Sequence, residues 1–360
     1  MPPDDRAEAS GHPSSPRRAG LPVPRFDHLR ALTDHAGLWE HAKLLVPRID
    51  HGFCTEDSAR ALVVVSRQAA LTGALEDLAA TYLRFVLESR TKAGAFRNRR
   101  AADGSWQEDG GSDDSQGRAW WGLGSAARLA PTESMRRAAM DAFATCGLFE
   151  SPHLRANAYT ALGVVEVLVA NPAHTGARDL LEETAGVIAD AARSAIPWPE
   201  DRLTYDNARL PDALLAAGTI LGRRRLIADG LRLLEWLVNV ETIGDHFSFA
   251  PTSGWSIGEP RPGFDQQPVD AWAMADACHR AWVVTGDSVW RVRALRAARW
   301  LVGGNDIGIS LYDPESGATY DGLHSDSVNE NRGAESTLAG IGTLQVAASC
   351  EASPRRLAFP

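Results

Sequence analysis

Twelve amphipathic helical runs follow one another along the chain, and almost no stretch between them alternates as a β-strand does. Clear boundary signals separate the runs, such as Ser151-Pro152, an N-cap residue followed by a first-turn proline. Only two stretches, His246–Trp255 and Ile307–Tyr320, are suited to short hairpins. The helices are expected at residues 27–44, 57–71, 73–90, 115–129, 132–148, 153–171, 175–194, 210–221, 223–239, 267–285, 287–302 and 333–350. The sequence therefore predicts an all-α fold of six antiparallel helical hairpins.

Six helical hairpins can stack as an open α-solenoid or close into a toroid of six inner and six outer helices. Solenoids usually show a sequence repeat of about 34–47 residues, and no such repeat is visible here. Instead, a polar cluster precedes or opens every second helix, at residues 51–60, 111–118, 151–157, 205–209, 263–268 and 329–337. In antiparallel hairpins these alternate helices all begin at the same end of the bundle. We therefore predict one (α/α)6 toroid over residues 26–352, with the clusters around one mouth and short loops or hairpins at the rim.

The charge and composition of the chain bear on its partners and its cellular compartment. The net charge of −9 argues against a nucleic-acid or anionic-membrane partner, and no apolar run reaches the length of about 18 residues that spans a bilayer. Residues 1–25 are rich in Pro, Ser, Arg and Asp and are expected to be a disordered tail rather than a signal peptide, while residues 353–360 are expected to be a C-terminal tail. No CxxC spacing occurs, which indicates a reduced cytoplasmic chain without a disulfide framework or zinc site; the cysteines are Cys54, Cys146, Cys278 and Cys350.

The polar clusters are rich in carboxylates, which suits the cleavage of glycosidic bonds. That reaction needs one protonated carboxyl group as acid and a second carboxylate as base or nucleophile. Acidic residues at helix starts can also serve only as N-caps, and pairs such as Asp57/Arg60 can be simple helix-surface ion pairs. Their recurrence at six alternate helices favours a shared cavity. We expect the catalytic pair to come from Asp114, Asp206, Asp265 and Glu335.

The same clusters supply donors, acceptors and aromatic rings that could hold a sugar. The expected substrate-binding residues are His51, Asp57, Arg60, Asp113, Arg118, Asn157, Glu200, Tyr205, Arg209, Gln266, Gln267, Asp321, His324 and Asn331. Tryptophans in or beside the clusters could stack under sugar rings or belong to the core; they are Trp106, Trp120, Trp121, Trp198 and Trp255. Histidine spacing does not favour a catalytic metal, and neither a GxSxG elbow nor a Rossmann glycine motif after a strand is present. No metal or cofactor is expected.

Several motifs resemble those of a known group. They are HGFCTEDSARAL (51–62), GSDDSQGRAWWGLG (111–124), LTYDNARLPDALL (203–215), FDQQPVDA (264–271), YDGL (320–323) and NENRGAEST (329–337). With these motifs the chain resembles the six-hairpin, (α/α)6-toroid carbohydrate-active proteins, and more closely a bacterial group often labelled glycosyltransferase-like. The resemblance implies the toroid fold, a glycan ligand and a possible glycosyltransferase partner. Ser58, Asp113 and Arg332 differ from the group's pattern, which has an amide-type residue, a Glu and a Gln at these places.

Three functions are compatible with these observations. The first is a glycoside hydrolase-like enzyme that cleaves an oligo- or polysaccharide, with inversion expected because a toroid places its acids across a wide mouth. The second is a non-catalytic glycan-binding or glycosyltransferase-accessory module, which would need fewer carboxylates. The third is a glycoside phosphorylase, in which Arg60, Arg118 or Arg209 could bind the phosphate.

Overall fold

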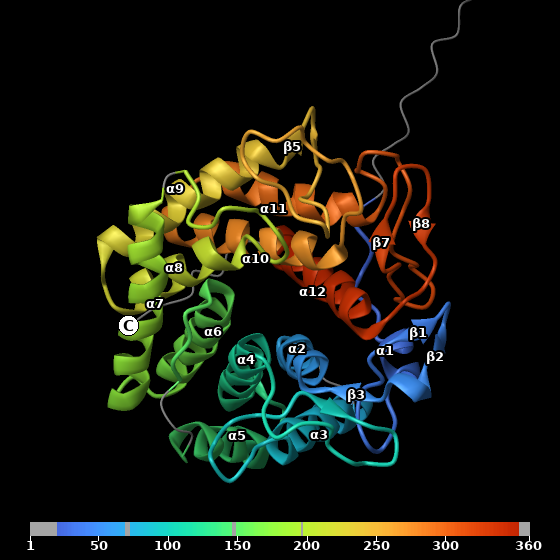
Figure 1. Cartoon of the computed structure of the whole chain (residues 1–360), viewed down its shortest axis with the longest axis vertical. Helices are drawn as coiled ribbons and strands as arrows, with labels where there is room; N and C mark the ends of the chain where they lie inside the picture. The colour runs from blue at the N-terminus through green and yellow to red at the C-terminus, as the bar shows by residue number, and fades with distance from the viewer. Residues whose placement is uncertain (1–19, 69–72, 146–148, 196, 353–360) are drawn as a thin grey trace, which may run out of the picture.

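The computed structural model describes residues 20–68, 73–145, 149–195 and 197–352. These residues form twelve α-helices and one short 3-10 helix, Ile49–His51 (Figure 1). The α-helices are α1 (Asp27–Ala31), α2 (Thr55–Ser66), α3 (Gly73–Glu88), α4 (Asp113–Leu129), α5 (Glu133–Thr145), α6 (Leu154–Ala170), α7 (Thr175–Ser194), α8 (Arg209–Ile220), α9 (Arg224–Val240), α10 (Pro268–Thr285), α11 (Ser288–Leu301) and α12 (Ala334–Glu351).

The even-numbered helices form a closed inner ring. Each packs on the next in the series α2, α4, α6, α8, α10 and α12, and α12 packs back on α2. The odd-numbered helices α3, α5, α7, α9 and α11 cover this ring from outside, each against its preceding inner helix, and α1 packs on α12 (Figure 1). The prediction of an all-α, (α/α)6 toroid is therefore confirmed.

Local sequence signals explain most helix boundaries. Ser112 caps α4 by accepting a hydrogen bond from the Ser115 amide, and Asp287 caps α11 in the same way. Pro268 occupies the first turn of α10, where its missing N–H costs no hydrogen bond, and Gly286 ends that helix in the left-handed conformation at φ +74°. Because each of these signals acts over a few residues, most of the helix boundaries are visible in the sequence.

The first predicted helix is wrong in length. A single helix was expected over residues 27–44, but α1 ends at Ala31. The carboxylate of Asp34 accepts hydrogen bonds from the amides of Ala36 (2.7 Å) and Gly37 (3.1 Å), which turns the chain. A side chain at position 37 would meet the Phe85 ring at 2.9 Å, so the turn packs closely on α3.

Short antiparallel sheets surround the mouth of the ring. The pairs are β1 (Ala42–Lys43) with β2 (Val46–Pro47), β3 (Phe53–Cys54) with β4 (Arg99–Arg100), β5 (Thr242–Ile243) with β6 (His246–Phe247), and β7 (Gly322–Leu323) with β8 (Val328–Asn329). The two stretches expected to form hairpins contribute β6 and isolated bridges, such as Leu203 with Trp255 and Tyr312 with Thr319. The rim therefore contains short paired segments, but only the second stretch pairs within itself, because the partners of His246–Phe247 and Trp255 lie outside the first.

The predicted tails fall mostly outside the described residues, namely at 1–19 and 353–360. Residues 20–25 are described and contain neither helix nor strand, and the Arg25 amide donates a hydrogen bond to the Tyr312 hydroxyl at 3.0 Å. Three cysteines, Cys54, Cys278 and Cys350, are free and buried, whereas Cys146 lies outside the described residues. Within the described part of the chain, no helix combines the length and the apolar character needed to cross a membrane.

Candidate active site

Three adjoining cavities open where the inner helices begin. Their volumes are about 320, 730 and 400 Å³, and the 730 Å³ cavity lies between the other two. It shares Glu56, Arg60, Gln267 and Glu335 with the first and Asp114, His153 and Tyr205 with the last. The starts of α2, α4, α6, α10 and α12 and the loop before α8 all contribute to these linings, so the polar clusters do converge on one mouth.

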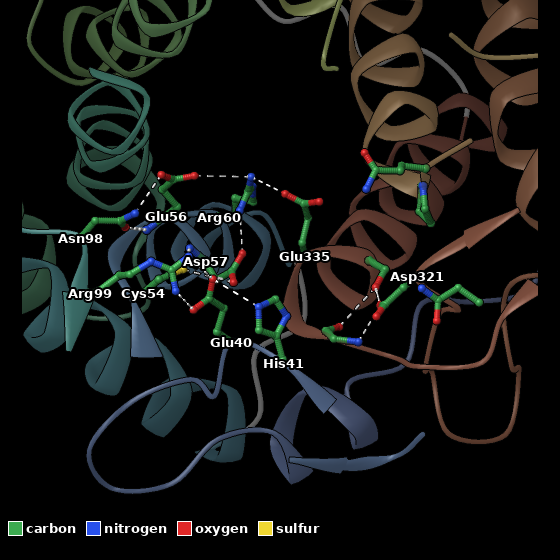
Figure 2. Close-up of a pocket in the computed structure, with 15 residues that line it drawn as sticks. Glu40, His41, Cys54, Glu56, Asp57, Arg60, Asn98, Arg99, Asp321 and Glu335 are labelled. Atoms are coloured by element: carbon green, nitrogen blue, oxygen red, sulfur yellow. Dashed lines mark hydrogen bonds and ion pairs between the residues drawn. The ribbon is translucent and has the colours of Figure 1, made fainter. Parts of the chain in front are cut away.

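Arg60 joins two inner helices in this mouth. Its buried guanidinium group donates to Asp57 on α2 and to Glu335 on α12, both at 2.6 Å. Figure 2 shows Glu335 on one side of Arg60 and Glu56 on the other. The side chain of Glu335 keeps 39% of its surface exposed, so it can contact a ligand in either neighbouring cavity.

Glu56 is a site residue that the sequence analysis missed. Its carboxylate lies 3.9 Å from Arg60 and 3.6 Å from Arg118, and it accepts a hydrogen bond from Asn98 at 3.0 Å. The available signal was its position beside Asp57 in the first turn of α2. Both residues line the first cavity, but adjacent helical residues point about 100° apart, and only Glu56 also reaches the second cavity.

Asp114 and Tyr205 form the junction between the second and third cavities. The Tyr205 hydroxyl donates to the Asp114 carboxylate at 2.5 Å, and the guanidinium group of Arg155 lies over the Tyr205 ring at 4.9 Å. Arg155 is itself held by Glu200 at 2.6 Å. On the other side, Asp113 accepts a hydrogen bond from Ser151 at 2.6 Å. These contacts fix the aromatic ring and the carboxylate in one arrangement at the cavity wall.

Burial shifts the proton affinity of two carboxyl groups in the first cavity. It raises the pKa of Asp57, an effect that the charge of Arg60 opposes and those of Glu335 and Glu40 reinforce. Burial also raises the pKa of Asp321, although Ser336 and the Gly333 amide donate hydrogen bonds to its carboxylate. Both groups are therefore held in an environment that disfavours their charged form.

Asp206, a predicted catalytic residue, has no surface on these cavities. It is fully buried at φ +53°, and its carboxylate accepts a hydrogen bond from Tyr159 at 2.7 Å. Burial alone would raise its pKa, but Arg118 at 3.1 Å and Arg209 at 3.5 Å lower it. The structure thus places Asp206 behind Arg118, as an ionised anchor for that guanidinium group.

Four predicted binding residues also point away from the cavities. Arg209 is fully buried between the rings of Trp121 and Trp272, with 4.6 and 4.8 Å from its guanidinium carbon to the ring centroids. The others satisfy local backbone groups: Asn157 donates to the carbonyls of residues 151 and 153, Gln266 accepts from the Phe249 amide, and Asn331 accepts from the Leu44 amide.

Asp265, the remaining predicted catalytic residue, lies at the rim. Its half-exposed carboxylate pairs with His324 at 2.6 Å, and neither residue lines the three cavities. His51 is also outside them, 3.6 Å from Asp50. None of the five tryptophans singled out in the sequence lines the three cavities either, and Tyr205 is the aromatic residue that does.

Loops before the inner helices add residues that periodicity did not reveal. Glu40 and His41 lie in the stretch wrongly assigned to the first helix, and both line the first cavity (Figure 2). Arg99 binds Glu40 through two hydrogen bonds of 2.6 and 2.9 Å. His153 lines the second and third cavities. Among the described residues, no group of three or more His, Cys, Asp or Glu side chains is placed to hold a metal ion.

A chain of alternating charges runs from this mouth through the inner ring. Arg118 contacts Asp206 at 3.1 Å, Asp206 contacts Arg209 at 3.5 Å, and Arg209 contacts Asp276 on α10 at 2.6 Å. Asp276 then contacts Arg67, just after α2, at 2.9 Å. The predicted polar clusters therefore continue into a buried network that reaches the opposite mouth.

Comparisons with known proteins agree with this architecture. No family model matches the sequence, and a search of curated proteins found no match. Solved structures do match. A sugar epimerase from a ruminal bacterium has a TM-score of 0.65 at 12% identity over 89% of this chain and 95% of that chain. A D-mannose isomerase has a TM-score of 0.69 at 11% identity over 90% and 94%, and the cellulase Cel9M of C. cellulolyticum has 0.58 at 11% over 89% and 88%. At such identities these likenesses show that the chain shares its toroid fold with these proteins.

Proposed function

We propose that this protein is a sugar-active enzyme that cleaves a glycosidic bond, with Glu335 and Asp114 as its working carboxylates. The observation that carries the proposal is that both residues line the same 730 Å³ cavity from different inner helices. That volume is typical of small-molecule sites, which are about 300–1,000 Å³. The structural neighbours include a cellulase and a sugar epimerase, which supports a carbohydrate ligand.

The contacts of the two carboxylates favour different roles. Glu335 is paired with the guanidinium group of Arg60, which suits a carboxylate that activates water as a base. Asp114 accepts a hydrogen bond from a neutral tyrosine hydroxyl and forms no ion pair with any described residue, which suits the acid that protonates the leaving oxygen. The two carboxylates come from different helices around a cavity of about 730 Å³, and we propose that a water molecule enters between them and gives inversion.

Isosteric substitutions test the assignment. Glu335→Gln and Asp114→Asn should each lower turnover of a cleaved oligosaccharide by about 100-fold or more, the usual scale for acid–base groups. Glu183→Gln and Asp179→Asn, at exposed positions on the outer helix α7, are matched controls. NMR of the first-formed anomer reports the stereochemistry. Near-full activity in both site variants would show the assignment to be wrong.

Epimerisation or isomerisation of a sugar is a second candidate. The sugar epimerase and the D-mannose isomerase have TM-scores of 0.65 and 0.69, above that of the cellulase, and additional bases are supplied by His41 in the first cavity and His153 in the second. Such enzymes exchange a carbon-bound hydrogen with solvent. Incubation with sugars in D₂O separates the candidates, because deuterium incorporation without bond cleavage would favour epimerisation.

Phosphorolysis is less well supported. Of the three arginines considered for a phosphate site, Arg209 is buried beneath the cavity floor. Arg60 is already neutralised by Asp57 and Glu335, and Arg118 by Asp206 and Glu56. A phosphate ion would have to displace one of these carboxylates. If the protein binds a glycan but shows neither turnover nor exchange of hydrogen with solvent, it is a glycan-binding module.

A further inference from the structure

A separate cavity of about 530 Å³ lies at the opposite mouth of the toroid. It is lined where the inner helices end, and it shares no lining residue with the three cavities of the candidate active site. Much of its wall is apolar and comes from α6, α8, α10 and α12: Val165, Ala216, Ile220, Val283, Val284 and Val346. This composition is typical of a small-molecule pocket with a few polar groups to orient the ligand.

Three nitrogen-bearing side chains line one part of this cavity with donors to spare. Arg67 uses one terminal nitrogen for Asp276, and Arg280 uses its Nε for Asp212. The other terminal nitrogens of both guanidinium groups make no hydrogen bond with the described residues, and neither does the His279 ring. Unused guanidinium nitrogens beside an imidazole are well suited to bind an anionic group.

The carboxylates near this cavity are already paired. Each carboxylate beside the cavity already contacts a guanidinium group: Asp276 contacts Arg67 and Arg209, Asp212 contacts Arg280, and Glu166 contacts Arg128. None of these carboxylates is therefore left unpaired to repel an entering anion. An entering anion could contact the unused guanidinium nitrogens of Arg67 and Arg280 without displacing an existing pair.

We propose that the cavity at the opposite mouth is a second ligand site, which binds a small organic anion with an apolar body. The anionic group, a carboxylate or a phosphate monoester, contacts Arg67, Arg280 and His279. The body lies against the aliphatic wall formed by Val165, Val283 and Val346. The proposal is independent of the chemistry assigned to the first mouth, because the two linings have no residue in common.

Calorimetric titration of the full chain tests this site with probes that share one body. Hexanoate and hexyl phosphate are the anions, and hexanol and hexylammonium are the neutral and cationic controls. We expect at least one anion to bind at least tenfold more tightly than both controls. Whichever anion binds better identifies the preferred head group. No binding of either anion, or equal binding of hexanol, would overturn the proposal.

Variants locate the binding. Arg67→Gln should weaken anion binding at least tenfold while the protein stays folded, because Asp276 keeps its contact with Arg209. His279→Gln provides a second variant that breaks no ion pair. Arg137→Gln, an exposed change on α5, is the matched control, and Glu335→Gln should leave anion binding unchanged. Unaltered binding in both R67Q and H279Q, or loss of binding in E335Q, would contradict the assignment.

Discussion

Two carboxylates with similar sequence settings, Asp206 and Glu335, differ in their access to the cavity. Asp206 lies in the loop before α8, Glu335 lies in the first turn of α12, and both contact an arginine. Asp206 has Arg118 and Arg209 around it and no exposed surface, whereas Glu335 lines two cavities. Solvent access, rather than residue type, therefore separates the anchoring role of Asp206 from the catalytic role proposed for Glu335.

Asp206→Asn should destabilise the protein by about 3–5 kcal/mol, because it leaves the buried guanidinium group of Arg118 without its nearest charge partner. Urea unfolding measures the loss. Asp265→Asn, which alters a half-exposed pair at the rim, should change stability by less than about 1 kcal/mol. Equal effects of the two substitutions would show that Asp206 is not an anchor.

Glu241, at the end of α9, should make stability depend on pH. Burial raises its pKa to about 7, although the Ala250 amide donates a hydrogen bond to it at 3.1 Å. Between its ordinary pKa of 4.5 and pH 7 the folded state keeps the proton and the unfolded state does not, so stability falls as pH rises through this window.

Glu241→Gln should remove that dependence, because glutamine stays neutral and can still accept the amide hydrogen bond. The variant should match the wild type near pH 4.5 and exceed it by at most about 3 kcal/mol at pH 8. Chemical denaturation across this pH range is the measurement. A stability gain of the variant that is largest at low pH would contradict the raised pKa of Glu241.

At the scale of elements, α4 and α6 approach so closely that side chains are excluded between them. A Cβ atom at Gly124 would lie 2.0 Å from the Gly163 carbonyl oxygen, and one at Gly163 would lie 2.3 Å from the Trp120 carbonyl oxygen. Both neighbours are backbone atoms, which cannot rotate away. This contact sets the distance between two inner helices that carry site residues, Arg118 on α4 and Arg155 on α6.

Gly163→Ala should therefore destabilise the protein by about 1–3 kcal/mol, the usual range for overpacking. Gly186→Ala on the outer helix α7 is the matched control, since nothing lies within 4 Å of its added Cβ. That change should stabilise by about 0.5–1 kcal/mol, because alanine favours helix. Thermal or urea unfolding of both variants gives the comparison, and similar effects at the two positions would argue against close helix packing.

At the scale of the whole molecule, Arg209 links three helices through the centre of the ring. Its guanidinium group lies between Trp121 of α4 and Trp272 of α10, and it pairs with Asp276 while belonging to α8. Arg209→Lys keeps the charge but loses the planar group that stacks on both rings. Each desolvated cation–π contact contributes about 2 kcal/mol, so we expect a loss of about 2–4 kcal/mol in urea unfolding.

The same variant tests the earlier binding hypothesis for Arg209. Because this side chain is fully buried, Arg209→Lys should leave ligand affinity nearly unchanged as long as the protein is folded. Glu335→Gln, measured in parallel, should lower turnover of the sugar substrate without a comparable loss of stability. An affinity loss in R209K with wild-type stability would restore Arg209 as a contact residue.

The sequence by itself determined the twelve helices, their pairing and the convergence of the polar clusters. These features follow from hydrophobic periodicity, caps and breakers, which act over a few residues. Four of the residues predicted from the sequence as site residues do line the mouth: Arg60, Asp114, Tyr205 and Glu335. It missed the end of α1, because the turn at Asp34 depends on a side chain accepting from the backbone and on close packing against Phe85.

Only the tertiary structure decided which polar residues face a cavity and which lie behind it. Asp206, Arg209 and Gln266 share the clusters with Asp114 and Tyr205, yet they are fully buried. Helix periodicity identifies a direction around one helix, but access to solvent depends on the neighbouring helices of the closed ring. The charge chain from Arg118 to Arg67 is hidden from the sequence for the same reason, since its members come from four segments that meet only when the ring closes.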